Sequence, residues 1–156
     1  MEASLYSPLY LYTSTFACVL ISIQYISSPD HHLQEEKKNF IIPLIIALIL
    51  VFWMGNRPIS SAFGDTVNYA WSYQLIKSYD FTIDWSEEWL WECITRTCKS
   101  LNYSINTYFT IIEAGYILSA FWAIKRFMPN NPLLGLFFIW TSLMFFSFGT
   151  NGIRNG

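Results

Sequence analysis

The stretch NFIIPLIIALILVFWMG, residues 39–55, is the strongest apolar segment of the chain and decides its fold class. It contains no charged residue, and its length approaches the ~20 residues that a helix needs to cross the hydrocarbon core of a bilayer. Three further predominantly apolar segments lie at 9–26, 108–124 and 133–149. The sequence therefore predicts about four transmembrane helices.

The overall composition agrees with a membrane location. Of the 156 residues, 53% are hydrophobic and 13% are charged, whereas a soluble domain carries about 25% charged residues. Aromatic residues make up 19%, and Trp and Tyr collect at membrane interfaces. The net charge of −2 is too small and too mixed to indicate nucleic-acid binding. We expect an all-α, polytopic membrane bundle in contact with lipid.

Basic residues between the apolar segments predict the orientation. Lys37 and Lys38 precede the second segment, and Lys125 and Arg126 follow the third. Both pairs belong to the same side, and the positive-inside rule makes that side cytoplasmic. The N-terminus and the outer segment, residues 56–106, are then expected to face outward.

The outer segment is expected to be helical as well. Asp65 can cap a helix that runs to about Tyr79. A second helix is expected from Asp84, because Asp84 and Glu87 have the spacing of a capping box. Apolar residues then recur near the helical period opposite charged ones, which is typical of an amphipathic helix on a membrane surface. The apolar positions are Trp85, Trp89, Cys93, Ile94 and Leu101.

Two arginines follow the outer ends of apolar segments: Arg57 after the second and Arg154 after the fourth. The simple interpretation of Arg57 is a side chain that reaches the membrane surface from a helix end. Positive-inside statistics disfavour an exported basic residue at that place. If the two helices pack together, both guanidinium groups can bind one phosphate or diphosphate, because guanidinium is planar, always charged and bidentate.

Three other polar residues are candidates for a site. Asp65 is most simply an N-cap, but Tyr69 lies four residues later, so that a carboxylate and a hydroxyl can point into one cleft. Glu113 lies in the middle of the third apolar segment, where a carboxylate is costly. Glu113 is either a functional group or a hydrogen-bonded packing residue beside Gly115.

Neither a metal nor another cofactor is expected. His31 and His32 precede Glu35 and Glu36, but adjacent histidines in a polar loop are usually solvated. The three cysteines are odd in number and include no CxxC spacing, which indicates core thiols rather than a disulfide framework.

The order of these features resembles the N-terminal part of the EpsG family of Wzy-like polysaccharide polymerases. The resemblance is carried by RPISSAFGDTVNY at 57–69, EEWLW at 87–91 and GIRNG at 152–156. The residues that carry it are Arg57, Gly64, Asp65, Tyr69, Glu88, Gly152, Ile153 and Arg154.

The resemblance implies an enzyme of exopolysaccharide, capsule or O-antigen assembly in the bacterial inner membrane. Such an enzyme joins oligosaccharide repeats linked to undecaprenyl diphosphate, beside a flippase and a chain-length regulator. Its arginines neutralise the diphosphate leaving group without a metal. It is a larger bundle, of which this chain is expected to be an inactive fragment. The implied catalytic residues are Arg57, Arg154 and Asp65, and the implied substrate-binding residues are Tyr69, Glu88 and Glu113.

The alternative is a non-catalytic membrane protein of the same pathway, such as a transporter fragment or an assembly partner. Transporters show Gly- or Pro-broken helices and paired charges near the membrane midplane. In this sequence Glu113 is the lone midplane charge, which favours the enzyme.

Overall fold

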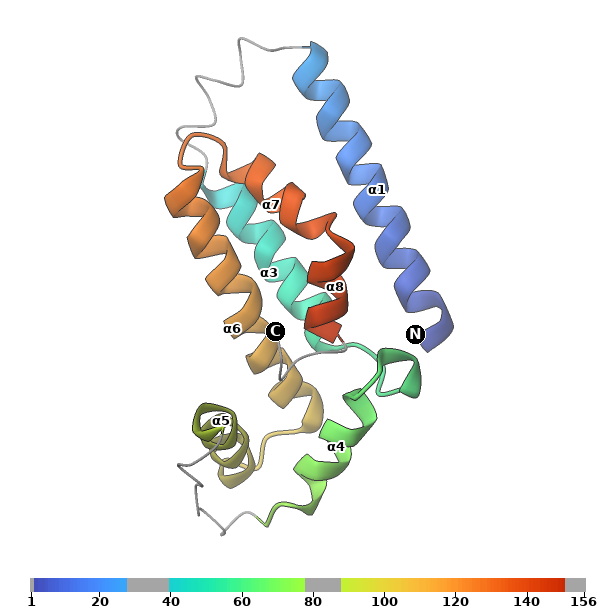
Figure 1. The fold of residues 1–156 in the computed structure, drawn as a ribbon, viewed down its shortest axis with the longest axis vertical. Helices are drawn as coiled ribbons and strands as arrows, with labels where there is room; N and C mark the ends of the chain where they lie inside the picture. The colour runs from blue at the N-terminus through green and yellow to red at the C-terminus, as the bar shows by residue number, and fades with distance from the viewer. Residues whose placement is uncertain (1, 28–39, 78–87, 151–156) are drawn as a thin grey trace.

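The computed structural model describes residues 2–27, 40–77 and 88–150, and all regular secondary structure in these residues is helical (Figure 1). The helices are α1 (Ala3–Ser27), α3 (Ile41–Gly55), α4 (Thr66–Leu75), α5 (Trp89–Ser100), α6 (Ile105–Phe127), α7 (Pro132–Trp140) and α8 (Leu143–Thr150), with a short 3-10 helix η1 (Ser61–Phe63). The expected all-α bundle is confirmed.

Helices α1, α3, α6, α7 and α8 form the bundle, and α4 and α5 lie beyond one end of it (Figure 1). The N-terminus, the C-terminal end of α3 and the start of α6 point toward this end. The end of α1, the start of α3 and the turn between α6 and α7 lie at the opposite end. The described helix ends that flank the two predicted cytoplasmic loops therefore share one end of the bundle.

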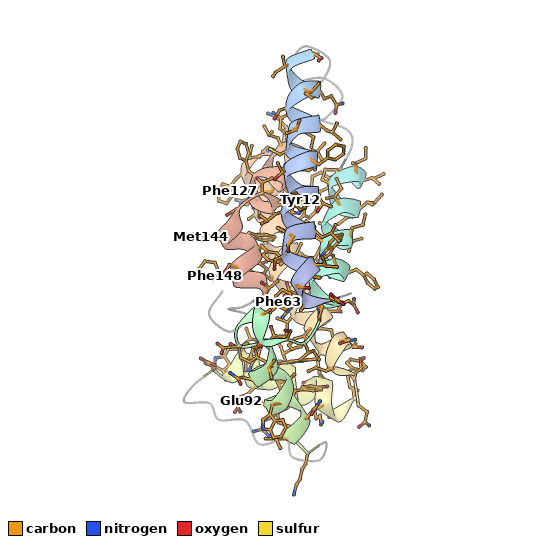
Figure 2. All side chains as sticks on the ribbon, turned by 90° about the vertical axis from the view of Figure 1, so that its right-hand side faces the viewer. Tyr12, Phe63, Glu92, Phe127, Met144 and Phe148 are labelled. Atoms are coloured by element: carbon orange, nitrogen blue, oxygen red, sulfur yellow. The ribbon has the colours of Figure 1, made fainter. Side chains whose placement is uncertain are left out.

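The surface of the bundle is apolar, as a membrane environment requires. Figure 2 shows side chains that project outward from α1, α6 and α8, among them Tyr12, Phe127 and Met144. Their exposed fractions are 74%, 81% and 69%. Exposed aliphatic and aromatic residues on this scale are unfavourable against water and favourable against lipid.

Two helices in the described residues are long and apolar enough to cross a membrane, α1 over residues 3–24 and α6. The pair α7 and α8 adds a third candidate if it counts as one bent span. Helix α3 is apolar but has 15 residues, or about 22 Å of helix, which is shorter than the ~30 Å hydrocarbon core. The structure thus has two or three candidate spans and one short apolar helix, rather than four uniform spans.

The fourth predicted span, 133–149, is not continuous: α7 and α8 are bent by 68°. The Thr141 hydroxyl donates to the Phe137 carbonyl at 2.8 Å, and such side-chain bonds to the preceding turn bend helices. The Tyr10 hydroxyl of α1 donates to the Trp140 carbonyl at 2.7 Å. This bond satisfies an acceptor that the end of α7 leaves without a helical partner.

Helix α1 is attached to the bundle by two tyrosines on one face. The Tyr6 hydroxyl donates to the Trp53 carbonyl near the end of α3 at 2.6 Å. The Tyr10 ring stacks on Phe146 of α8 with a centroid separation of 4.1 Å. Because α1 begins at Ala3 rather than at residue 9, Tyr6 lies inside the helix and can make this contact.

Helices α3 and α6 pack along each other and form the centre of the bundle. Their buried contact residues include Ala47, Leu50, Met54, Ile117 and Phe121. At Gly55 the two backbones come so close that an added Cβ would lie 2.6 Å from the Thr110 Cα. A glycine at this position therefore permits the closest approach of α3 and α6.

The helices beyond the bundle differ in detail from the prediction. Helix α4 ends at Leu75 instead of about Tyr79, and the predicted capping box at Asp84 and Glu87 lies outside the described residues, as does Trp85. Helix α5 lies across the long axis and is seen nearly end-on in Figure 1.

Helix α5 buries a face that the predicted apolar stripe does not include. Thr95 and Cys98 are buried, whereas Trp89 and Leu101 are 48% and 55% exposed. The reason is tertiary: Cys98 packs with Tyr73 of α4 and Tyr108 of α6, and Thr95 hydrogen-bonds the Tyr108 hydroxyl at 3.0 Å. The contacts with Tyr73 and Tyr108 determine which face of α5 is buried, and the spacing of apolar residues does not predict that face.

Candidate functional site

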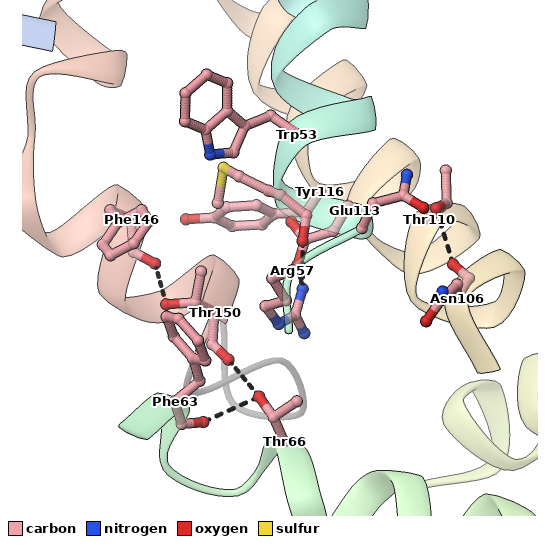
Figure 3. Close-up of polar contacts among 12 residues, drawn as sticks. Trp53, Arg57, Phe63, Thr66, Asn106, Thr110, Glu113, Tyr116, Phe146 and Thr150 are labelled. Carbon is pink, nitrogen blue, oxygen red and sulfur yellow. Dashed lines mark hydrogen bonds and ion pairs between the residues drawn. The ribbon is translucent and has the colours of Figure 1, made fainter. Parts of the chain in front are cut away.

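A buried ion pair joins α3 to α6 at the end that faces α4 and α5. Arg57 follows α3, and its Nη1 donates to Glu113 Oε1 at 2.7 Å (Figure 3). The same Nη1 donates to the Met54 carbonyl at 2.8 Å. The side chains of Arg57 and Glu113 are 0% and 1% exposed. The guanidinium also lies over the Phe109 ring, 4.7 Å from its centroid, a cation–π contact.

The end of α3 explains how Arg57 reaches this position. The helix stops at Gly55, and the Arg57 N–H donates to the Met54 carbonyl at 3.4 Å as the chain turns. Gly55 lets α6 approach, which brings Glu113 within reach of the guanidinium. Gly149 does the same for α8, because a Cβ there would lie 3.3 Å from Glu113 Oε2. Three helices thus converge on the pair.

The hydrogen bonds of the pair are incomplete. Arg57 Nε and Nη2 and Glu113 Oε2 are buried and have no hydrogen-bond partner among the residues that the structure describes. The Nε and Nη2 donors form the side-on edge of the guanidinium, which matches two oxygens of a phosphate or carboxylate. Buried donors without partners cost free energy, so an anion that reached this edge would relieve that cost.

An apolar groove of about 800 Å³ lies beside Arg57. Most of its wall is one face of α3 together with Tyr6 of α1, and its polar end is formed where α3 stops and α6 begins. The wall residues on α3 are Ile45, Leu48, Ile49, Phe52 and Trp53, and the polar end has Asn56, Arg57 and Asn106. The groove combines a surface that suits a lipid chain with polar groups at one end.

Asp65 stands at the N-cap position of α4, as predicted, but its side chain makes no capping hydrogen bond. It is exposed, and its Oδ1 accepts a hydrogen bond from Asn68 Nδ2 at 3.2 Å. The next residue, Thr66, is fully buried and donates to the carbonyls of Phe63 and Thr150, each at 2.9 Å (Figure 3). Thr66 therefore holds α4 against the end of α8.

Tyr69 is half-buried and faces α5, with its ring centroid 5.4 Å from that of Trp91. The cleft that Tyr69 lines does not include Asp65, so the two side chains do not share it. Glu88 lies exposed at the start of α5, where its side chain makes no capping hydrogen bond. Arg154 lies outside the described residues, as do His31 and His32 with the two glutamates that follow them.

No cluster of metal-ligating side chains occurs in residues 2–27, 40–77 and 88–150. Outside the apolar bundle, burial raises the pKa of the Tyr73 phenol and of the Cys98 thiol. Both groups therefore stay protonated near neutral pH, and Cys98 is a packing residue as the sequence indicated.

Of the predicted site residues, the structure brings Arg57 and Glu113 together. The sequence marks each of them as a costly polar residue in an apolar context, but they are 56 positions apart, and local spacing does not reveal the pairing. The sequence does not predict Thr66 or Trp91 as site residues. For Thr66 the sequence offers little signal, because the pattern does not distinguish a buried, hydrogen-bonded threonine from an exposed one.

A family model described as the EpsG family matches residues 40–156. The chain belongs to the EpsG family. The match includes the Arg57–Glu113 pair and helices α3 to α8, whereas α1 precedes it. No curated protein and no solved structure matches the chain. EpsG-family membership and the long apolar helices mark the chain as a membrane protein involved in polysaccharide formation.

Proposed function

We propose that this EpsG-family chain is part of a polymerase that joins undecaprenyl-diphosphate-linked oligosaccharide repeats into a surface polysaccharide. A hydroxyl of the acceptor repeat attacks the anomeric carbon of the donor repeat. A new glycosidic C–O bond forms, the bond from that carbon to the diphosphate oxygen breaks, and the acceptor hydroxyl gives up its proton. The lipid diphosphate leaves with the electron pair of the broken bond.

The observation that carries this proposal is the unsatisfied side-on edge of Arg57 next to an apolar groove. A lipid diphosphate has the matching form, a long apolar chain that ends in a multiply charged head. The groove along α3 would hold part of the chain, and the Nε and Nη2 donors would bind the diphosphate. Donors aimed at the charge that develops on a leaving group are worth about 10²–10³ in rate.

Because Arg57 is buried, binding of the diphosphate requires a change in the side chains around it. Its side chain has no exposed surface, so the diphosphate reaches it only if the side chains around it move. Glu113 keeps the guanidinium in place during that movement, because it engages Nη1 and leaves the side-on edge unused.

The remaining predicted residues also receive proposed roles. Arg154 would be the second cation at the diphosphate, and Asp65, Tyr69 and Glu88 would contact sugar hydroxyls at the end where α4 and α5 lie. We place the protein in the bacterial inner membrane with this end outward, where a flippase delivers repeats and a chain-length regulator limits the product.

Lysine substitution in the complete gene tests the role of Arg57. Lysine keeps the charge but loses the bidentate edge, so Arg57→Lys should leave single lipid-linked repeats in place of a ladder of polymer lengths. Arg126→Lys is the matched control, because Arg126 is exposed at the opposite end of the bundle, and it should give the wild-type ladder. A wild-type ladder from Arg57→Lys would mean that the arginine only supports the fold.

Transport is the second candidate, and two observations favour it: the bend between α7 and α8, and the pairing of Glu113 with a buried arginine. The location of the repeats that accumulate without the gene separates the candidates. A polymerase defect leaves single repeats on the outer face of the membrane, whereas a transport defect leaves them on the inner face. Periodate applied to intact cells oxidises only the outer pool.

A further inference from the structure

A second, smaller cleft lies between α4 and α5, outside the apolar bundle. Its volume is about 110 Å³, which at about 30 Å³ per water molecule is room for about four waters. Four aromatic side chains and several polar ones line it. The aromatic residues are Tyr69, Tyr73, Trp91 and Tyr108, and the polar residues are Ser72, Glu92, Thr95 and Arg96.

The deep wall of this cleft is fixed by internal bonds. Tyr73 and Tyr108 stack at 4.4 Å between centroids. The Tyr73 hydroxyl donates to the Tyr103 carbonyl at 2.8 Å, and the Tyr108 hydroxyl is bonded to Thr95. Both rings are nearly fully buried. These two tyrosines therefore form the back of the cleft, and both of their hydroxyls already take part in internal hydrogen bonds.

The rim of the cleft combines aromatic with charged groups. Tyr69 and Trp91 are half-buried, and their rings meet at an interplanar angle of 56°. Arg96 Nε and Glu92 Oε2 are 3.5 Å apart, one helical turn from each other on α5. Their side chains are 17% and 34% exposed, so both reach the cleft and also the solvent.

This combination fits the chemistry of a sugar ring. A pyranose has an apolar C–H face, which packs against aromatic rings, and an equatorial belt of hydroxyls, which hydrogen-bond to carboxylate and guanidinium groups. A mostly aromatic wall with a few placed polar groups is the usual form of a small-ligand site. The volume accommodates part of one ring, with the rest of the glycan outside.

The position of the cleft relative to Arg57 supports the same reading. Tyr108 forms the cleft wall, and the next residue on α6, Phe109, lies under the Arg57 guanidinium. The two rings are in contact, with centroids 5.5 Å apart. A glycan attached to a diphosphate at Arg57 would therefore extend toward the cleft within its first few sugars.

We propose that the cleft formed by Tyr69, Trp91, Glu92 and Arg96 is a subsite that binds one pyranose ring of the repeat-unit glycan. The assignment of the glycan rests on the proposed polymerase function. The binding of a sugar by the cleft is a separate property and is measured separately.

Binding is tested with the purified full-length protein in detergent. The probe is the oligosaccharide mixture from partial acid hydrolysis of the surface polysaccharide of the source cell, observed by saturation-transfer NMR. Trp91→Leu should weaken binding by about tenfold, because it removes the aromatic face, and Trp91→Phe should retain most of it. Trp71→Leu is the control, since Trp71 is 64% exposed on α4 and does not line the cleft.

Glu92→Gln provides a test that depends little on packing, because it keeps the shape of a partly exposed side chain and removes its charge. It should also weaken binding, with an unchanged unfolding temperature. Wild-type affinity in both Trp91→Leu and Glu92→Gln, or no binding by the wild-type protein, would overturn the subsite.

Turnover separates this proposal from the polymerase proposal. Trp91→Leu should raise the repeat concentration needed for half-maximal rate and leave the maximal rate unchanged, whereas Arg57→Lys should abolish polymer. If Arg57→Lys makes normal polymer while Trp91→Leu loses glycan binding, the leaving-group role of Arg57 fails and the subsite stands. If Arg57→Lys loses polymer and Trp91→Leu binds normally, the subsite fails alone.

Discussion

Two arginine–glutamate pairs in this chain have the same composition and opposite surroundings. Arg57 and Glu113 come from different parts of the fold, meet at 2.7 Å and are 0% and 1% exposed. Arg96 and Glu92 lie one turn apart on α5, meet at 3.5 Å and are 17% and 34% exposed. The α5 pair stays partly hydrated, whereas the buried pair has left water.

The difference shows why the buried pair is the more informative one. Taking two charges out of water costs several kcal/mol per ion, and the attraction between them offsets this only when their other hydrogen bonds are also made. Within the described part of the chain, Arg57 Nε and Nη2 and Glu113 Oε2 have no hydrogen-bond partner. Stability alone does not account for such a pair, since a neutral pair of similar volume is often as stable or more so. We propose that the pair is retained because an anion binds at the unused edge.

The largest effect is expected when one member of the buried pair is removed. Glu113→Leu leaves the Arg57 charge buried without its counter-charge, which should lower the free energy of unfolding by about 3–5 kcal/mol. Thermal unfolding of the purified full-length protein in detergent measures this loss. The double variant Arg57→Met with Glu113→Leu should recover most of it. A single variant as stable as wild type would show that water already reaches the pair.

The next effect concerns the helix contact that supports the pair. Gly55→Ala places a Cβ 2.6 Å from the Thr110 Cα, and because a backbone atom cannot move aside, α3 and α6 must separate. A loss of about 1–3 kcal/mol is expected in the same unfolding measurement. Gly115→Ala is the control on α6, where a Cβ meets nothing within 4 Å, and it should be neutral or stabilising. Equal stability of the two alanine variants would refute the close contact.

A smaller effect is expected at the helix break. Tyr10→Phe removes the hydroxyl that satisfies the Trp140 carbonyl and should cost about 1 kcal/mol. Tyr12→Phe, on the exposed side of α1 at 74% exposure, should cost nothing measurable. If both variants unfold alike, the α1–α7 bond does not contribute to the stability of the break.

The smallest effect belongs to the α5 pair. Glu92→Gln should change stability by less than about 0.5 kcal/mol, because an exposed pair one turn apart gains little from its charges. High salt should not increase the difference in stability between Glu92→Gln and the wild-type protein. A loss comparable to that of Glu113→Leu would remove the contrast between the two pairs.

The apolar segments alone predict most of the bundle. The predicted segment 39–55 ends at the last residue of α3 and begins two residues before it, and segment 108–124 lies within α6. The bend after Trp140 could not be foreseen, because part of its cause is a hydroxyl from Tyr10 on α1, 130 positions earlier. Local spacing does not record such contacts.

Prediction of the site from the sequence has the same limit, because its contacts join residues that are distant in the sequence. The cost of a charge in an apolar context identified Arg57 and Glu113 separately, and their pairing is a product of helix packing. The apolar period of α5 predicts one face of that helix and gives no sign that Thr95 is buried against the Tyr108 hydroxyl. Hydrophobic periodicity does not predict hydrogen bonds or ion pairs between polar residues that are distant in the sequence.

The central claim is that Arg57 is buried for binding rather than for stability, and the neutral pair tests it most directly. Arg57→Met with Glu113→Leu, introduced together in the complete gene, removes both charges and keeps the volume between α3 and α6. The measurement is the chain length of the polysaccharide in cells whose variant protein inserts and unfolds like wild type. We predict single lipid-linked repeats and no polymer. Long polymer from this stable, uncharged variant would contradict the claim.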